Sequence, residues 1–440
     1  MIDYGVDIID NIVEGFSRNI TWQVMLTTYW FLVFVEFPRY YLLEICIVLW
    51  RKLTYRSIRE KRNAARKRLY AERPFVTILA PGKNEGAHIY TLVQSLREQT
   101  YTNYEIIIVD DGSDDNSPLI CEDLKRAGYI DRFIHTNVRG GKASAANLGL
   151  RFSSGKYVIH LDADTSLDRH AIENILLPFY YGKDIRAVGG AVKVRNADDT
   201  ICSSLQALEY LKTIQVGRMV TNTLGILHII SGAFGAFDRK ALMQVGGWDI
   251  GPGLDGDITQ KFRKMGFRIS FAENAVAMTN APTSWRALYR QRQRWSKSLV
   301  RFRLRKHRDV FMPYGNFSFS NLISNLEGIM YDFVFNFIWV VYVVILILEH
   351  PDKIVEIFAV GYIIRFFFNL IAFSIIMLVS ERPSEEKHLI KYVPLSTFYT
   401  GYFLRMARLT AHLKEIFFFS SYKDAWNPRK TSEVAQVERI

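Results

Sequence analysis

Cysteine is scarce in this chain, with three in 440 residues, at positions 46, 121 and 202. They lie far apart and form no closely spaced pair, so the sequence offers neither a disulfide framework nor a cysteine-based metal site. This scarcity indicates a reducing compartment for the central part of the chain.

The N-terminal region lacks the basic stretch that begins a secretory signal peptide. Residues 1–20 are acidic instead, with Asp3, Asp7, Asp10 and Glu14. We therefore expect no cleavable leader. The chain also contains no internal repeat and no low-complexity tract.

Hydrophobic residues are abundant, at 49% of the chain, although the formal net charge is +12. The apolar residues gather in runs, which indicates a soluble domain between membrane segments. A net positive charge favours binding to nucleic acid, to anionic lipid or to a phosphorylated substrate. Because much of the positive charge lies beside the hydrophobic runs, we favour the membrane and expect no nucleic-acid partner.

Residues 27–50 form an apolar, aromatic run that is long enough to span a bilayer. Glu36, Arg39 and Glu44 interrupt it, so we expect some of these charges to face protein or water. A densely basic segment follows at 51–68, which the positive-inside rule places in the cytoplasm, with the N-terminus outside. The alternative is a buried hairpin of a soluble protein followed by a basic linker.

Apolar runs return near the C-terminus. Segments 329–348 and 357–379 are each long enough to span a membrane, and 395–420 is a third candidate that carries Arg405, Arg408 and Lys414. An interfacial helix is the alternative for this third segment. Charges at such depth, including Arg365 in the second run, usually face a bundle interior or a polar path.

Between these runs, residues 74–280 read as an α/β domain. We expect strands at 75–80, 104–109, 133–135, 157–161 and 187–194, and helices at 89–99, 118–127 and 144–152. This alternation predicts a mainly parallel, doubly wound sheet. Such sheets bind ligands at the carboxyl ends of their strands.

The strand at 157–161 leads directly into Asp162 and Asp164. Side chains two residues apart in an extended chain point the same way, so these carboxylates repel each other unless a cation lies between them. Oxygen ligands suit Mg²⁺ or Mn²⁺, and such an ion suits a diphosphate. The alternative is a solvated, aspartate-rich turn.

The motifs PGKNEG, DDGS and DAD all fall at strand carboxyl ends, so we expect them to converge on one edge of the sheet. Two further candidate sites lie earlier in the sequence. Asp110 and Asp111 end the second strand, where they are placed to accept hydrogen bonds from a nucleobase or ribose, or to form an Asx-type turn. Lys142 follows two glycines and precedes a helix, which favours a phosphate, although a surface turn would look the same.

A second set of candidates lies further along the chain. Asp257 sits in an acidic loop before a helix and could deprotonate an alcohol. Gln291, Arg294 and Trp295 share one helical face, where Trp can stack on a sugar and Arg and Gln can bind phosphate or hydroxyls. The alternative for 284–308 is a basic amphipathic helix on a membrane surface.

Taken together, these motifs resemble the processive membrane-embedded glycosyltransferases of family 2, which include cellulose, chitin-oligosaccharide, hyaluronan and poly-N-acetylglucosamine synthases. The resemblance rests on PGKNEG, VDDGS, GGKASAANLG, DAD, SGAFGAF, GLDGD and QRQRW, in that order between about residues 74 and 300. It implies a cytoplasmic α/β domain of the GT-A (Rossmann-like) fold, embedded in a bundle of transmembrane helices with interfacial helices. It also implies inverting transfer from a nucleotide-sugar donor.

The resemblance carries residue roles with it. Asp110 and Asp111 would bind the nucleoside, Lys142 would lie near the diphosphate, and Asp162 and Asp164 would hold donor and Mg²⁺ or Mn²⁺. The acceptor would meet Ser231, Gly232, Ala233 and Trp295, while Gln291 and Arg294 would hold diphosphate and Asp257 would be the general base. One departure is Gly256, which stands where the family usually has a carboxylate; Asp255 lies two positions before Asp257.

The expected organisation has six parts. These are an N-terminal tail and transmembrane helix (1–50), a basic linker (51–73), the GT-A domain (74–283), interfacial helices (284–328), C-terminal transmembrane helices (329–421) and a polar tail (422–440). We expect an enzyme of the plasma membrane that polymerises UDP-glucose or UDP-N-acetylglucosamine into an extracellular polysaccharide. The alternative is a non-processive enzyme that moves a sugar onto a polyprenyl phosphate or ceramide.

Overall fold

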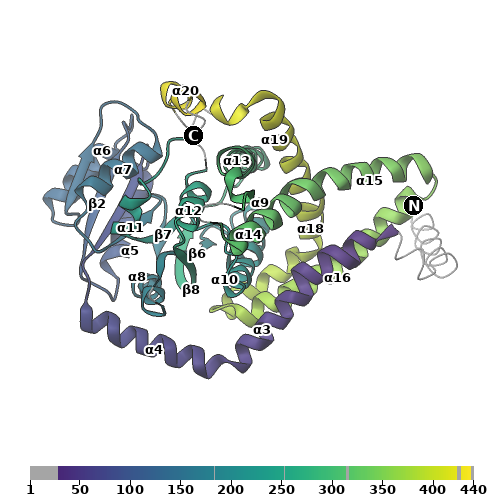
Figure 1. Cartoon of the computed structure of the whole chain (residues 1–440), viewed down its shortest axis with the longest axis horizontal. Coiled ribbons are helices and arrows are strands. Elements are labelled where there is room, and N and C mark those ends of the chain that lie inside the picture. Colours follow the sequence, from purple (N-terminus) through teal and green to yellow (C-terminus); the bar gives the residue numbers. More distant parts are fainter. Residues whose placement is uncertain (1–27, 183, 252, 314–316, 424–427, 438–440) are drawn as a thin grey trace.

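The computed structural model describes residues 28–182, 184–251, 253–313, 317–423 and 428–437. It has two parts (Figure 1). One contains a β-sheet with helices on its faces, and the other is a set of long helices, including α15 and α16, that project from it. The basic helix α4 (Tyr55–Glu72) runs along one edge of the sheet-containing part.

The sheet has eight strands in the order β3-β2-β1-β4-β7-β6-β8-β5. Their bounds are β1 Val76–Gly82, β2 Tyr104–Asp110, β3 Arg132–His135, β4 Tyr157–Leu161, β5 Ser166–Leu167, β6 Ile185–Val194, β7 Phe234–Asp238 and β8 Arg268–Thr279. The first four strands are parallel, as predicted. Strand β7 runs antiparallel to both β4 and β6, so the sheet is mixed where we expected it to be mainly parallel.

Alternate residues of the parallel strands enter two different cores. Ile78 and Ile106 pack with α5 (Gly86–Arg97) and α6 (Ser117–Arg126) on one face. Leu79 and Ile107 pack on the other face with α7 (Lys142–Phe152). A Cβ at Gly149 of α7 would lie 2.1 Å from Leu79 Cδ1, so glycine allows this close packing of helix on sheet. This is the doubly wound arrangement that the sequence predicts.

Several shorter helices complete the sheet-containing part. They are α8 Ala171–Leu176, η3 Leu177–Tyr180, α9 Ile201–Tyr210, η4 Leu211–Gly217, α10 Arg218–Thr223, α11 Arg239–Gln244 and α12 Leu254–Lys264. Helix α13 (Trp285–Leu299) follows, and the π-helical turn η5 (Val300–Lys306) and the short η6 (Arg308–Phe311) extend it.

The N-terminal helix consists of η1 (Leu32–Glu36), η2 (Pro38–Leu42) and α3 (Leu43–Leu53). The three charged residues that interrupt the apolar run of this helix all have protein partners. Glu36 pairs with Arg365 and Arg405, Arg39 pairs with Glu327, and Glu44 pairs with Lys212. The prediction that charges in this run face protein is therefore confirmed.

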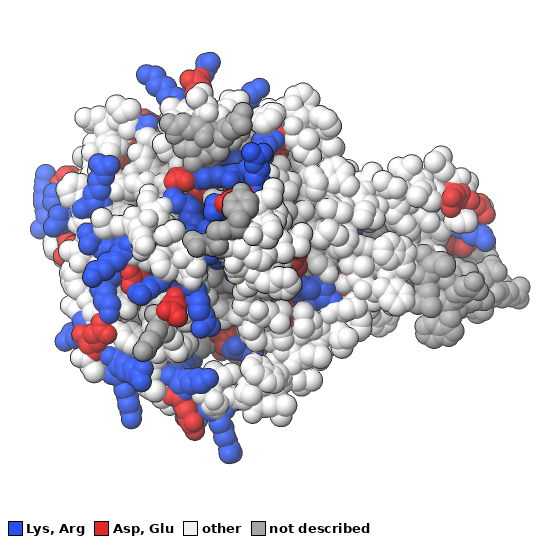
Figure 2. All heavy atoms as spheres, viewed as in Figure 1, with Lys and Arg blue, Asp and Glu red and all other residues white. Residues whose placement is uncertain are grey.

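Two long helices are apolar enough to cross a membrane. Phe319–Glu349 comprises α14 (Phe319–Ile329), η7 (Met330–Val334) and α15 (Phe335–Glu349); the second is α16 (Ile354–Val379). Few of their residues are fully buried in the protein, and most are partly exposed. Figure 2 shows Lys and Arg gathered over the sheet-containing part, while the projecting helices are nearly without charge.

The other two predicted spans do not meet the same test of length and hydropathy among the described residues. The first begins at residue 27, which lies outside them. The third comprises α18 (Val393–Phe398), η9 (Tyr399–Phe403) and α19 (Leu404–Phe418). The remaining elements are α17 Pro383–Glu386, η8 Lys387–Tyr392, η10 Ser420–Lys423 and α20 Arg429–Val437.

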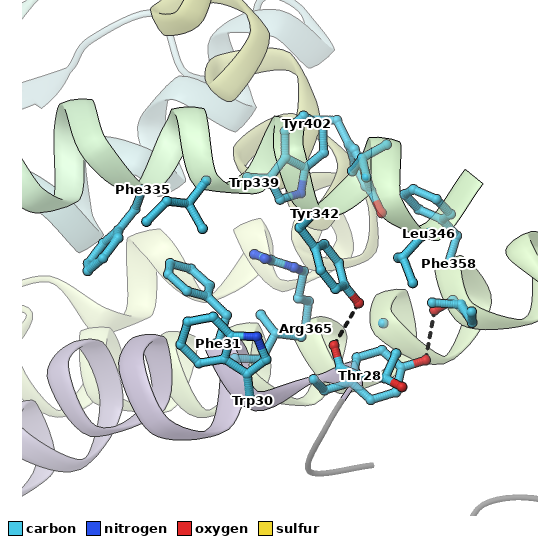
Figure 3. A pocket seen from close by; sticks show the side chains of 16 residues that line it. Thr28, Trp30, Phe31, Phe335, Trp339, Tyr342, Leu346, Phe358, Arg365 and Tyr402 are labelled. Carbon is cyan, nitrogen blue, oxygen red and sulfur yellow. Dashed lines mark hydrogen bonds between the residues drawn. The ribbon is translucent and has the colours of Figure 1, made fainter. Parts of the chain in front are cut away.

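A cavity of about 70 Å³ lies where α15, α16 and the N-terminal helix meet (Figure 3). Aromatic side chains form much of its wall, and Arg365 also lines it. Tyr342 donates a hydrogen bond of 2.6 Å from its hydroxyl to the Thr28 carbonyl oxygen, which ties α15 to the N-terminal helix.

Candidate active site

Asp110 and Asp111 are buried at the carboxyl end of β2 and organise the loops around them. Asp111 accepts hydrogen bonds from the backbone N–H groups of Gly140 (2.7 Å) and Gly141 (2.8 Å). Asp110 accepts from the Ser113 N–H (3.1 Å) and from His135 Nδ1 (2.7 Å). Both carboxylates are therefore engaged by protein, as in the turn-forming alternative.

Lys142 opens α7 directly after this loop and forms an ion pair with Asp162. Gly141 precedes it with φ of 91°, a conformation that glycine adopts without strain. Asp111 thus holds the glycine loop, and the loop places a cation and a helix N-terminus beside the aspartate pair. The predicted convergence of these motifs on one sheet edge is confirmed.

Asp162 and Asp164 follow β4, and Glu85 at the start of α5 joins them. Burial raises the pKa of Asp164, and the negative charge of Asp162 raises it further. Burial, together with the charges of Asp164 and Asp162, raises the pKa of Glu85 to about 7. The three carboxylates therefore lie in a field with excess negative charge, which a divalent cation would relieve.

The carboxylates fit only part of a metal coordination shell. Among the residues that the structure describes, no three His, Cys, Asp or Glu side chains lie close enough together to hold one ion. A cation at Asp162 and Asp164 would need further ligands, and Mg²⁺-type ions commonly take these from substrate phosphates and water.

The loop before β7 lies against the aspartate pair. The N–H of Asp162 donates to the Ala233 carbonyl oxygen at 3.4 Å, and His160 Nδ1 donates to the Gly232 carbonyl oxygen at 2.7 Å. A Cβ at Gly232 would lie 3.6 Å from the Cβ of Asp255. The structure therefore brings the predicted acceptor loop, the aspartate pair and Asp255 together.

Asp257 lies elsewhere, in a buried ionic cluster. Lys306 Nζ donates to its Oδ2 at 2.8 Å, and His307 Nε2 donates to its Oδ1 at 2.7 Å. Burial alone would raise the pKa of Asp257, but the His307 hydrogen bond and the Lys306 charge outweigh it and lower the pKa to about 2. Such a carboxylate is a weak base, and both its oxygens are occupied.

The structure thus moves the candidate base from the expected Asp257 to Asp255. Both residues belong to the first turn of α12, where side chains two positions apart point in directions that differ by about 160° around the helix axis. Asp255 is half-buried and makes no ion pair with any described residue. The sequence interpretation placed Asp257 in a loop before the helix, and so missed this difference in direction.

Gly256 has a steric explanation. A Cβ there would lie 2.3 Å from the ring of Phe302 in η5, so a carboxylate side chain would not fit beside this ring. Gly253, with φ of 88°, similarly approaches Ser298 of α13. These two glycines allow α12 to pack closely on α13 and η5. This packing brings Asp255 towards the face of α13 that carries Gln291, Arg294 and Trp295.

On α13, Gln291 and Arg294 are half-buried and Trp295 is 39% exposed, so the predicted shared face is confirmed as the open one. The other side of the helix is buried. Gln293 Nε2 donates to the Ala407 carbonyl oxygen of α19 at 2.7 Å. The helix therefore lies between the sheet-containing part and α19, as Figure 1 shows.

Sequence reasoning missed four polar residues around this site: Glu85, Glu209, Arg218 and Arg292. Glu85 stands in the PGKNEG turn at a strand end, which was a readable signal. Burial lowers the pKa of Arg218 to about 10, although the Asp255 charge opposes this, and its buried Nη1 has no hydrogen-bond partner among the described residues. Arg292 lies within the QRQRW motif but was given no role, and nothing in the local sequence marks Glu209 or Arg218.

Comparison with known proteins identifies the domain. Residues 77–246 match the family model "Glycosyl transferase family 2". Two curated relatives are named poly-beta-1,6-N-acetyl-D-glucosamine synthase. That of Staphylococcus epidermidis is 27% identical over 342 residues, covering 75% of this chain and 80% of the relative. That of Staphylococcus aureus is 29% identical over 274 residues, covering 62% of this chain and 64% of the relative.

A solved structure supports the fold. A mannosyltransferase from Pyrobaculum calidifontis, in complex with GDP-Man and Mn²⁺, superposes with a TM-score of 0.52 at 19% identity. The superposition covers 85% of this chain and 99% of the mannosyltransferase. The fold is thus GT-A-like, and the chain is a glycosyltransferase that is similar to glycosyl transferase family 2 over residues 77–246 and to the two poly-beta-1,6-N-acetyl-D-glucosamine synthases over most of its length.

Proposed function

We propose that this chain is an inverting, processive β-glycosyltransferase of the plasma membrane that polymerises UDP-N-acetylglucosamine into an extracellular polysaccharide. The observation that carries the proposal is the meeting of Asp162 and Asp164 with the Gly232 loop and Asp255. This arrangement offers a cation site for a diphosphate beside a free carboxylate for a hydroxyl. The printed names of the two staphylococcal relatives support the choice of sugar.

On the donor side, Asp162 and Asp164 would hold Mg²⁺ or Mn²⁺, which would offset negative charge on the diphosphate leaving group. Lys142 would bind the diphosphate, because it lies at a helix N-terminus next to Asp162. Asp110 and Asp111 would shape the nucleoside pocket through the loops they hold. Gln291 and Arg294 would complete the diphosphate site from the open face of α13.

On the acceptor side, Trp295 would stack on the terminal sugar of the polymer while Ser231, Gly232 and Ala233 line its path. A hydroxyl of that sugar would attack the anomeric carbon on the face opposite the diphosphate. The bond from that carbon to the diphosphate oxygen would break, and the hydroxyl proton would pass to a carboxylate oxygen of Asp255. One glycosidic bond forms, and nucleoside diphosphate leaves with its charge held by the donor-side groups.

The proposed membrane arrangement follows the charge pattern. The N-terminal helix, Phe319–Glu349 and α16 would span the bilayer, and α19 would complete the bundle. The basic helix α4 would lie on the cytoplasmic side with the GT-A domain, and the N-terminus outside. We keep the division into six parts predicted from the sequence, except that 284–306 packs against the domain and α19.

The test is to supply purified full-length protein with a panel of UDP- and GDP-sugars, to measure nucleotide release and to size the product on a gel. We expect UDP release with UDP-N-acetylglucosamine and a long product. Transfer of one sugar to a polyprenyl phosphate or ceramide, without chain growth, would favour the non-processive alternative. Nucleotide release with none of the donors would contradict the proposal.

A further inference from the structure

The indole of Trp295 is covered in part by a neighbouring cation. The guanidinium carbon of Arg292 lies 4.3 Å from the centre of the Trp295 ring, within the range of a cation–π contact. The two residues are three positions apart on α13, so they stack along the same side of the helix. Tyr210 of α9 flanks both, with its ring centre 6.4 Å from that of Trp295.

Arg292 is held by Glu209, which is in turn held by Tyr399. Its Nη2 donates to Glu209 Oε2 at 2.9 Å, and both side chains are nearly buried, at 8% and 10% exposure. The hydroxyl of Tyr399 donates to the same oxygen at 2.5 Å. Burial would lower the pKa of Arg292, but the Glu209 charge outweighs this and raises it, so the guanidinium stays charged.

These contacts join three separate segments. Glu209 belongs to α9 of the sheet-containing part, Arg292 to α13, and Tyr399 begins η9 of the C-terminal helices. Trp285 and Leu288, one to two turns earlier on α13, pack against the same C-terminal segment. The orientation of Trp295 is therefore tied to both the sugar-transfer domain and the helical bundle.

We propose that Glu209 and Tyr399 act through Arg292 to fix the orientation of Trp295, and that these positioning residues set the affinity for the acceptor sugar. The inference rests on the proposed function, in which Trp295 receives that sugar. An isolated indole at 39% exposure would rotate among several rotamers. A planar guanidinium anchored by Glu209 limits this freedom, so that less entropy is lost when a sugar stacks.

A space-filling role alone would not require this chemistry. A buried ion pair costs desolvation, and apolar residues of similar volume often replace one without loss of stability. Arg292 also keeps its Nε buried without a partner among the described residues, which adds to that cost. The pair is therefore explained better by its directional hold on the indole than by packing.

The experiment measures elongation of a soluble β-linked N-acetylglucosamine oligosaccharide by the full-length protein, with KM for acceptor and for donor determined separately. For Arg292→Met we expect acceptor KM to rise about five- to tenfold while donor KM changes less than about twofold. Arg292→Lys, which keeps the charge, should recover part of the affinity. Arg290→Met, an exposed position on the same helix, is the matched control and should change neither constant.

A second comparison separates positioning from general damage. In a Trp295→Ala background, Arg292→Met should raise acceptor KM no further, because the indole it orients is gone. The same fold increase in both backgrounds would overturn the proposal, as would equal changes in donor and acceptor KM. If Trp295→Ala itself leaves acceptor KM unchanged, the acceptor role of Trp295 is wrong and the inference fails with it. If Trp295→Ala raises acceptor KM but Arg292→Met does not, only the inference fails.

Discussion

The two sides of the active site are built in different ways. The proposed donor side comes mainly from the turns that follow β1, β2 and β4, three adjacent parallel strands, together with the start of α7. The proposed acceptor side combines the loop before β7, the first turn of α12 and Trp295 of α13, a helix whose Gln291 and Arg294 we assign to the donor side. These pieces meet only through tertiary packing, such as the approach of Gly253 to Ser298.

The difference shows what a local motif can and cannot specify. A strand end points its next residues at a sheet edge, so the position of Asp164 follows from the position of β4. The first turn of a helix points successive residues in different directions, so the choice between Asp255 and Asp257 depends on where the helix begins. Mutations on each side should therefore test different kinds of inference.

The largest effect should come from the donor side. Asp164→Asn, or removal of divalent cations with EDTA, should reduce nucleotide release to background, because the charge on the leaving diphosphate is no longer offset. Added Mn²⁺ or Mg²⁺ should restore the EDTA-treated protein but not the variant. Full turnover in EDTA would show that this side works without a metal.

On the acceptor side, Asp255→Asn should lower turnover at least about a hundredfold, the usual size of a general-base effect. Binding of UDP should be retained, since donor contacts are unaffected. Asp257→Asn should lower turnover far less in protein that remains folded. If Asp257→Asn abolished turnover and Asp255→Asn did not, Asp257 would be the base, and the position of Asp255 beside Gly232 would have no catalytic role.

Asp257→Asn should act on stability instead. Replacing this carboxylate weakens its charged hydrogen bonds to Lys306 and His307, which should cost about 2 kcal/mol of the free energy of unfolding. Because the pKa is lowered from 3.8 to about 2 on folding, the carboxylate stabilises the protein fully above pH 4 and loses this effect as the pH falls towards 2. The thermal unfolding midpoints of wild type and variant should therefore converge over that range.

The smallest effect concerns Lys142. Lys142→Met should raise donor KM about tenfold through the loss of one charged contact with the diphosphate, with acceptor KM unchanged. Lys125→Met, at an exposed position on α6, is the matched control. A rise in acceptor KM of similar size would mean that the two sides are not separable in the way described.

Sequence patterns predicted the parallel half of the fold closely. The strand expected at 157–161 is β4 with the same bounds, and that at 104–109 differs from β2 by one residue. Strands β5, β7 and β8 were not predicted. Strand β8 contains the segment AENA (272–275), whose residues are uncommon in strands, and 273–275 lie at an irregularity in the pairing with β6. The hydrogen bonds of Glu209 with Arg292 and with Tyr399 join positions 83 or more residues apart, so no local pattern contains them.

The ion pairs of Glu36 bear on the order in which the chain is made. In the proposed membrane arrangement, this carboxylate enters the bilayer with the first helix, but its partners Arg365 and Arg405 lie 329 and 369 residues later. At a synthesis rate of about 5–20 residues per second, the first helix waits on the order of tens of seconds for a counterion. Until then the carboxylate must be protonated, hydrated or shielded by the insertion machinery. The bundle therefore closes only when the last helices arrive, which makes completion of the C-terminal segment a checkpoint for assembly.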